Sequence, residues 1–242
     1  MTDSLSLPER LRDVRISESP GDRFGTVLLL TLLPVPLVSL LYAVHSTVTG
    51  TPPGSYSMTT GYLFYGVVNL AVVGLLYTLL TPTQRSAVFR FRWPSVTEAA
   101  AAIVAFVLGL GVYQATAQLN ALLGYELQGL SYSLSDPTAV AIVVGGAVVL
   151  APITEEILYR GLVLEALTER GFGPVVATVL MTLLFALIHL PNFGVAGTIF
   201  ISVWGFLPAI LRLRYENLSG AVVMHMLNNG FAYVVTVAAG WA

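Results

Sequence analysis

Several charged and polar side chains interrupt the long apolar stretches of this 242-residue chain. They form three groups along the sequence, and they are Glu155, Glu156 and Arg160, then His189, then His225 and Asn229. A charged side chain at the centre of a bilayer costs about 2.5–3.5 kcal/mol even on the gentler insertion scales. A helix that only has to span a membrane needs none of these groups, so together they predict a functional site.

The spacing of the first group separates two roles. Glu156 and Arg160 are four residues apart, so on a helix they share a face and can form an ion pair, which we expect to be mainly structural. Glu155 points about 100° away from Glu156 on the same helix. It has no cation within reach along its own helix, and an isolated carboxylate suits a general base or a general acid.

The second group lies opposite the first in a predicted helical hairpin. The turn between the two helices centres near Phe172, and Glu155 and His189 each lie 17 residues from it. With a rise of about 1.5 Å per residue, both side chains are about 25 Å from the turn. An antiparallel hairpin therefore brings Glu155 and His189 to the same depth in the membrane.

The third group shares one face of the last apolar stretch, because His225 and Asn229 are four residues apart. Polar side chains at such depth normally face the interior of a helix bundle or a cavity. The neighbouring Asn228 is expected to hydrogen-bond between helices, as buried asparagines commonly do. His45, near the end of the first apolar stretch, is expected to be an interfacial histidine.

The composition predicts the architecture around these residues. Hydrophobic residues make up 56% of the chain and charged residues 10%, with a mean hydropathy of +0.81. An average soluble domain carries about 25% charged residues. We therefore expect an all-α, polytopic transmembrane bundle that contacts the lipid bilayer and has no nucleic-acid partner. The chain has no cysteine, which excludes disulfides and thiolate chemistry.

The chain is long enough for about seven spans of about 20 residues each. The predicted domains are a cytoplasmic N-terminal segment (1–23) and a transmembrane bundle (24–242). The first apolar stretch lacks a small-residue cleavage site and is expected to be a retained span. The seven apolar stretches are Phe24–Val44, Tyr62–Leu80, Ala99–Leu123, Thr138–Glu169, Pro174–His189, Val195–Leu213 and Leu218–Trp241.

Arginine positions predict the orientation. If seven spans alternate, all 11 basic residues of the chain, each an arginine, fall on one side of the membrane. The positive-inside rule makes that side cytoplasmic, so the N-terminus is expected inside and the C-terminus outside. The basic, aromatic segment Arg85–Trp93 is expected either to lie on the inner membrane surface or to form an ordinary loop.

Three motifs carry a family resemblance. Glu155–Arg160 reads EExxxR, Phe185–His189 reads FxxxH, and His225–Asn229 reads HxxxN. In this order, over about residues 138–235, they resemble the CPBP family of intramembrane proteases (the CAAX protease and bacteriocin-processing family), which includes Rce1-type CAAX endopeptidases. The resemblance implies that Glu155 and His189 activate a water, that His225 and Asn229 bind the oxyanion, and that Glu156 and Arg160 support the site.

The expected function is therefore intramembrane endopeptidase activity on a membrane-associated peptide or protein, including prenylated CAAX-type substrates, in a multi-pass protein of the cell membrane. No metal cofactor is expected to be required. Glu155, His189 and His225 could hold zinc or another divalent metal in the alternative mechanism. The competing functions are a proton-coupled or small-solute transporter, since intramembrane Glu and His also serve transport, and a non-catalytic membrane scaffold.

Overall fold

The computed structural model describes residues 24–126 and 132–241, and every regular element in these two ranges is a helix. The expected all-α fold is confirmed. The N-terminal segment 1–23, predicted to be cytoplasmic, lies outside the described residues.

The N-terminal half supplies helices on two sides of the bundle. They are α2 (Phe24–Leu32), α3 (Pro34–Thr49), the 3₁₀ turn η2 (Pro53–Ser55), α4 (Met58–Leu79), α5 (Pro82–Val88) and α6 (Val96–Leu123). Helices α4, α5 and α6 begin at Ser57, Thr81 and Ser95, whose side chains accept a hydrogen bond from a backbone N–H of the first turn. These caps fix where each helix starts.

The C-terminal half contains the longest helix. It runs from Pro137 to Glu169 as α7 (Pro137–Ile142), η3 (Val143–Leu150), α8 (Ala151–Glu156), η4 (Ile157–Val163) and α9 (Leu164–Glu169), with η3 and η4 widened into π-helix. After it come α10 (Pro174–Leu187), α11 (Leu190–Trp204), α12 (Phe206–Tyr215), α13 (Ser219–Gly230), the π-helical η5 (Phe231–Val235) and α14 (Thr236–Ala239).

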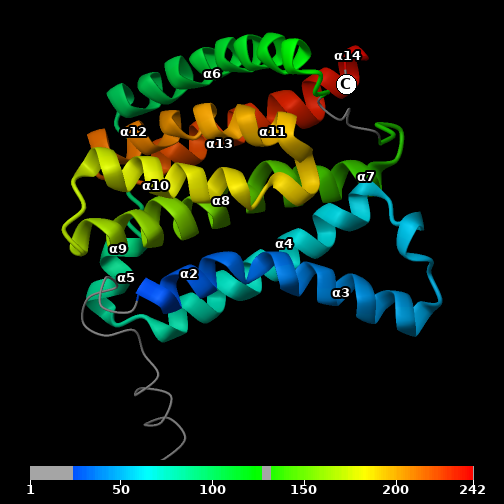
Figure 1. Cartoon of the computed structure of the whole chain (residues 1–242), viewed down its shortest axis with the longest axis horizontal. Coiled ribbons are helices and arrows are strands. Elements are labelled where there is room, and N and C mark those ends of the chain that lie inside the picture. Colours follow the sequence, from blue (N-terminus) through cyan, green and yellow to red (C-terminus); the bar gives the residue numbers. More distant parts are fainter. Residues whose placement is uncertain (1–23, 127–131, 242) are drawn as a thin grey trace, which may run out of the picture.

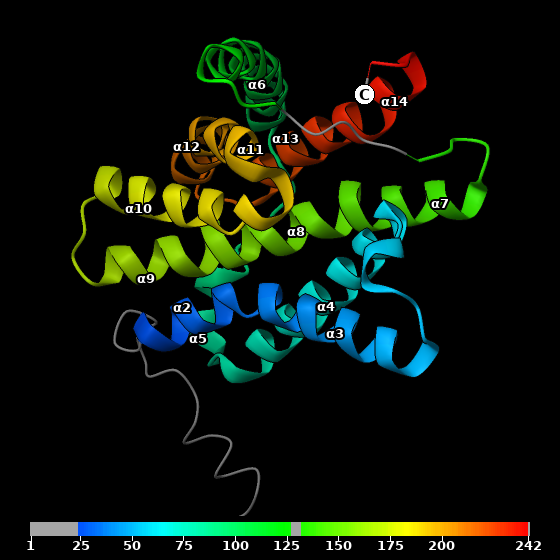
Figure 2. The same cartoon turned by 45° about the vertical axis from the view of Figure 1, so that its right-hand side comes forward.

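The long α7–α9 helix runs through the middle of the bundle (Figures 1 and 2). Helices α2, α3 and α4 lie on one side of it, and α10 to α13 lie on the other, with α6 outermost against α11 and α13. The central helix therefore presents its side chains to helices from both halves of the chain. Any polar group near its midpoint is surrounded by protein.

Six helices in the described residues are long and apolar enough to cross a membrane, where the sequence predicts about seven spans. The remaining predicted span is α10, which is apolar but has only 14 residues. At about 1.5 Å per residue it is about 21 Å long, less than the roughly 30 Å hydrocarbon core. All seven predicted apolar stretches are helical.

The chain between α10 and α11 differs from the prediction. The predicted apolar stretches leave residues 190–194 as a connection, but Leu190–Asn192 already form the first turn of α11. Pro191 is compatible with this because a proline in the first helical turn has no N–H that would need a partner. The break comes later, at Gly194, whose φ of 62° and ψ of −168° are not helical.

The basic segment Arg85–Trp93 forms most of α5 and then an extended stretch. The Arg92 backbone pairs with the Asn217 side chain, which accepts from the Arg92 N–H at 2.9 Å and donates to the Arg92 carbonyl at 3.0 Å. Trp93 is 98% exposed on the outside of this segment. The segment is thus anchored to the bundle through Asn217 while its aromatic side chain faces outward.

Candidate active site

The two glutamates lie in a short α-helical piece between two widened turns. α8 carries Glu155 and Glu156, with the π-helical η3 before it and η4 after it. Pro152 lacks an N–H to donate within the helix. The residue before it, Ala151, bonds to the carbonyl of Gly146 five residues back, in the π-helical pattern. Such π-helical turns are frequent at functional sites.

The predicted ion pair is present. Arg160 Nη1 lies 3.1 Å from Glu156 Oε1, and both side chains are fully buried. Arg160 also donates from Nη2 to the Gly205 carbonyl at 2.9 Å, and its guanidinium lies 4.4 Å from the centre of the Phe185 ring. Arg160 thus ties the central helix to α10 and to the junction of α11 and α12.

His189 follows the end of α10, as the sequence predicts, and is buried. Its Nδ1 lies 2.7 Å from the Phe185 carbonyl. Because a carbonyl can only accept, Nδ1 carries the hydrogen and Nε2 of the neutral ring is an acceptor. The ring lies against Phe185, with centroids 4.7 Å apart, and stacks on Phe193 at 5.7 Å.

His225, on α13, reaches both glutamates. Its Nδ1 lies 2.8 Å from Glu156 Oε1, and its Nε2 lies 3.8 Å from Glu155 Oε2. The Glu156 carboxylate accepts from Nδ1–H, so Nε2 is an acceptor when the ring is neutral and a donor when the ring is protonated. Trp204 packs edge-on against the ring, with centroids 4.8 Å apart.

Glu155 lies at the centre of the group and is buried. Its Oε2 is 4.0 Å from His189 Nε2 and 3.8 Å from His225 Nε2. The structure thus brings Glu155 and His189 close together, which agrees with the predicted hairpin alignment. Both distances are too long for a direct hydrogen bond, so a hydrogen-bonded link between these groups requires an intervening water.

Asn229 is one turn beyond His225 on α13, but its amide turns elsewhere. Its Nδ2 donates to the Ala147 carbonyl in η3 at 2.9 Å. Asn228 Nδ2 lies 3.4 Å from Asn229 Oδ1. His45 is in a separate aromatic cluster, where its Nδ1 lies 2.9 Å from the Tyr56 hydroxyl. The structure thus brings Glu155, Glu156, Arg160, His189 and His225 into one contact network and leaves Asn229 at its edge.

Comparison with known families agrees with this geometry. Residues 137–231 match the family described as type II CAAX prenyl endopeptidase Rce1-like. The matching residues, 137–231, are called the Rce1-like domain below because of this similarity. No curated protein and no solved structure gives a significant match. The predicted family resemblance is confirmed over these residues, and the six membrane-length helices make the chain a multi-pass membrane protein.

The Rce1-like domain includes all three motifs, but one contact to its central glutamate comes from outside it. The Tyr65 hydroxyl, on α4, donates to Glu155 Oε1 at 2.6 Å. Sequence reasoning missed Tyr65 because it is one of 11 tyrosines and has no charge or spacing that marks it. Only the packing of α4 on α8 relates the two residues, which are far apart in sequence.

The sequence analysis also missed a third buried carboxylate, which contacts the first turn of α13. Glu98, on α6, accepts from the Gly220 N–H at 2.8 Å and from Asn217 Nδ2 at 3.0 Å. It thereby satisfies the Gly220 backbone donor in the first turn of α13, where an anion is favourable. Because Glu98 is in the first turn of α6, its position resembles that of an ordinary capping or interfacial residue, and nothing in the sequence indicates burial.

The donor set of the Rce1-like domain shares one feature with a zinc site but lacks the spacing of its ligands. Both imidazoles present Nε2 inward and have Nδ1 bonded to an oxygen, as metal-bound histidines do. However, ligands bonded tetrahedrally at 2.0–2.1 Å are roughly 3.4 Å apart, and Glu155 Oε2 is 3.8 and 4.0 Å from the two nitrogens. In the described residues no group of three or more such side chains is close enough to hold a metal ion. As arranged, the residues do not fit the metal.

Proposed function

We propose that this protein is an intramembrane endopeptidase in which Glu155 and His189 activate a water for attack on a peptide bond. The observation that carries the proposal is the convergence of Glu155 Oε2 with two imidazole nitrogens at 3.8 and 4.0 Å, deep in a membrane protein. In this arrangement a water donates one hydrogen to Glu155 Oε2 and the other to His189 Nε2. Its lone pair is then directed at the substrate carbonyl.

The proton balance needs only this chain and water. Glu155 takes a proton as the water oxygen bonds to the scissile carbonyl carbon, and the carbonyl oxygen becomes an oxyanion. When the tetrahedral intermediate collapses, the C–N bond breaks and Glu155 returns the proton to the leaving amine. The products are a carboxylic acid and an amine, the glutamate is again ionised, and a proton then passes from the acid to the amine to give a carboxylate and an ammonium.

His225 and Asn229 are the proposed oxyanion donors. His225 can donate from Nε2 when its ring is protonated, with Nδ1–H on Glu156. The Asn229 amide nitrogen carries two hydrogens, of which one donates to the Ala147 carbonyl. Donors fixed in advance stabilise the charge that develops in the transition state. Glu156 and Arg160 support the site by fixing His225.

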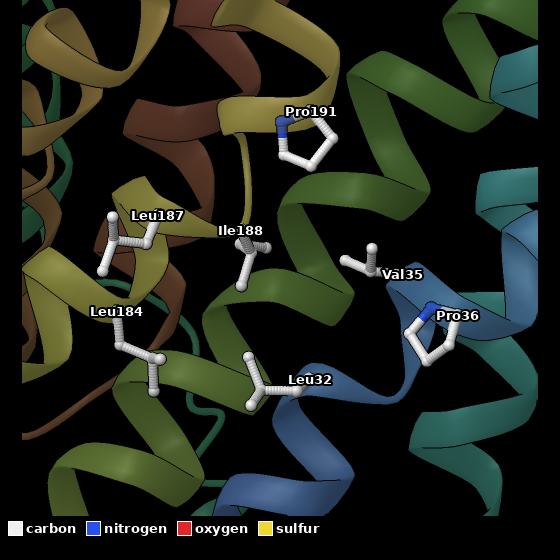
Figure 3. Close-up of a pocket in the computed structure, with 7 residues that line it drawn as sticks. All are labelled: Leu32, Val35, Pro36, Leu184, Leu187, Ile188 and Pro191. Carbon is white, nitrogen blue, oxygen red and sulfur yellow. The ribbon is translucent and has the colours of Figure 1, made fainter. Parts of the chain in front are cut away.

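An apolar pocket of about 390 Å³ supports a lipid-linked substrate. Figure 3 shows its seven lining residues, and they are Leu32, Val35, Pro36, Leu184, Leu187, Ile188 and Pro191. Ile188 directly precedes His189 and Pro191 follows it by two residues, so part of the pocket lining comes from residues next to His189 in the sequence. We propose that the substrate is a membrane-associated peptide, of the prenylated CAAX type, and that the protein acts in the cell membrane.

The test uses purified full-length protein in lipid nanodiscs with matched farnesylated and unmodified CAAX peptides, followed by mass spectrometry of the products. Cleavage of the farnesylated peptide by wild type, and none by Glu155→Ala, supports the proposal. Absence of cleavage by well-folded wild type would overturn it. The same assay after chelator treatment should keep its activity, whereas loss that added zinc restores would favour the metal mechanism.

A further inference from the structure

The two oxygens of the Glu155 carboxylate have different surroundings. Oε1 accepts from the Tyr65 hydroxyl at 2.6 Å, a length typical of a hydroxyl bonded to a carboxylate. Oε2 is the oxygen that faces His189 and His225. Tyr65 therefore hydrogen-bonds to Oε1 and leaves Oε2 available to the proposed water.

This division matters because the last torsion of a glutamate is soft. Rotation of the carboxylate about χ3 has broad, roughly two-fold preferences, so it is poorly fixed by its own side chain. Among the described residues, Tyr65 alone donates a hydrogen bond to the Glu155 carboxylate, since both imidazole contacts exceed 3.5 Å. Without the tyrosine hydroxyl, the plane of the carboxylate is free to turn away from His189.

Tyr65 is itself held on a closely packed part of α4. Asn69 Nδ2 donates to the Tyr65 carbonyl at 2.9 Å. The next residue, Gly66, lies against Gly146 of η3, where a Cβ on Gly66 would be 3.7 Å from the Gly146 Cα. From the other side, a Cβ on Gly146 would be 3.0 Å from the Tyr62 carbonyl oxygen. The backbones of α4 and η3 are thus in contact on both sides of Tyr65, which fixes the distance from Tyr65 to Glu155.

We infer that Tyr65 is a positioning residue for the hydrolytic reaction, which locks Glu155 Oε1 so that Oε2 stays aimed between His189 and His225. The inference rests on the proposed function, and it adds a residue from outside the Rce1-like domain to the site. The N-terminal helices then do more than enclose the Rce1-like domain, because α4 sets the orientation of Glu155, the proposed general base. A positioning role predicts a loss in the chemical step and none in substrate binding.

The experiment compares Tyr65→Phe with Tyr77→Phe in the nanodisc assay on the farnesylated peptide. Both substitutions remove one hydroxyl from α4, but Tyr77 is 49% exposed and far along the helix from the site. Misplacement of a catalytic group by about 1 Å costs up to about 100-fold in rate. We expect kcat of Tyr65→Phe to fall about 10- to 100-fold with KM unchanged, and Tyr77→Phe to match wild type.

The possible failures are distinct. If wild type cleaves no peptide, the proposed function fails and the positioning role falls with it. If wild type and Tyr77→Phe are active and Tyr65→Phe keeps the wild-type kcat, only the positioning role is overturned. A rise in KM at constant kcat also overturns it, because Tyr65 would then bind substrate. Thermal unfolding of each variant checks that the bundle is intact, and loss of kcat in a stable Tyr65→Phe protein supports the inference.

Discussion

Glu156 shows how one buried carboxylate can serve two neighbours. Its Oε1 lies 3.1 Å from Arg160 Nη1 and 2.8 Å from His225 Nδ1, while its Oε2 is buried without a hydrogen-bond partner. Arg160 therefore compensates the negative charge of Glu156, which the His225 imidazole would otherwise have to balance alone. By fixing the Nδ1 side of His225, Glu156 also sets the direction of Nε2.

Removal of Arg160 should consequently destabilise the fold. An Arg160→Ala protein retains a fully buried Glu156 without its cation, which costs about 3–5 kcal/mol when such a pair is broken. Thermal unfolding in detergent should show a clearly lower melting temperature than wild type. Arg214→Ala, at an exposed arginine, is the control and should melt like wild type. Equal melting of the two variants would show that the pair contributes nothing to stability.

Asn229 is the site residue whose role the geometry supports least directly, since its amide donates to Ala147. If its second N–H reaches the oxyanion, Asn229→Ala should keep residual activity but lose about 100- to 1000-fold in kcat, as removal of one oxyanion donor typically does. Asn228→Ala is the neighbouring control and should stay near wild type. A loss below about tenfold in Asn229→Ala would assign the residue to packing of α13 on η3 and not to catalysis.

The residues that sequence reasoning found are those whose type is costly in a membrane. Glu155, His189 and His225 stand out because few side chains of the apolar stretches can ionise. Tyr65 and Trp204 contact the same groups, yet both are ordinary constituents of transmembrane helices, so only the three-dimensional packing reveals them. The direction of the Asn229 amide also cannot be predicted from the sequence, because it depends on which helix lies next to α13.

At the scale of elements, the π-helical turns around α8 determine where the glutamates point. The sequence predicts one long helix from Thr138 to Glu169 and places the following turn near Phe172, which agrees with α9 ending at Glu169 and α10 starting at Pro174. That register is enough to align Glu155 with His189. The widened turns η3 and η4 were not predicted, because the backbone there has a pattern that neither apolar spacing nor residue propensity specifies.

Two adjacent glycines in η3 give a test of this packing. A Cβ on Gly146 would lie 3.0 Å from the Tyr62 carbonyl oxygen, whereas a Cβ on Gly145 meets nothing within 4 Å. Gly146→Ala should therefore push α4 away from η3, lengthen the Tyr65–Glu155 contact and lower kcat about 10- to 100-fold. Gly145→Ala makes the same chemical change without a clash and should keep the wild-type kcat. If both variants are equally active, the spacing of α4 and η3 does not control the site.

For the whole molecule, contacts among charged groups agree with the predicted alternation of spans. Arg212 Nη2 of α12 lies 3.6 Å from Glu165 Oε2 of α9, and Arg90 Nη1, after α5, lies 3.7 Å from Glu216 Oε2. These contacts join three chain segments at one end of the bundle. The segments are the one after the second predicted span, the end of the fourth span and the end of the sixth. Since these segments carry arginines, the positive-inside rule still predicts that this end is cytoplasmic.

This orientation can be tested with reporters fused to the C-terminus. An odd number of crossings with a cytoplasmic N-terminus places the C-terminus outside, and this requires α10 to cross despite its 14 residues. We expect a C-terminal alkaline phosphatase fusion to be active and a C-terminal fluorescent-protein fusion to be dark in bacterial cells. The reverse pattern would mean that α10 enters and leaves on one side, or that the arginine-rich end is external.

The most direct test of the account is the single-turnover rate at which Glu155→Gln cleaves a peptide that wild type cleaves. Glutamine preserves the size of the side chain but cannot take a proton from water, and loss of a general base typically costs about 100- to 10,000-fold. Glu216→Gln, whose side chain is 74% exposed, is the matched control. The account predicts that Glu155→Gln loses at least about 100-fold in rate at an unchanged melting temperature, while Glu216→Gln equals wild type. A stable Glu155→Gln protein that cleaves within about tenfold of the wild-type rate would contradict it.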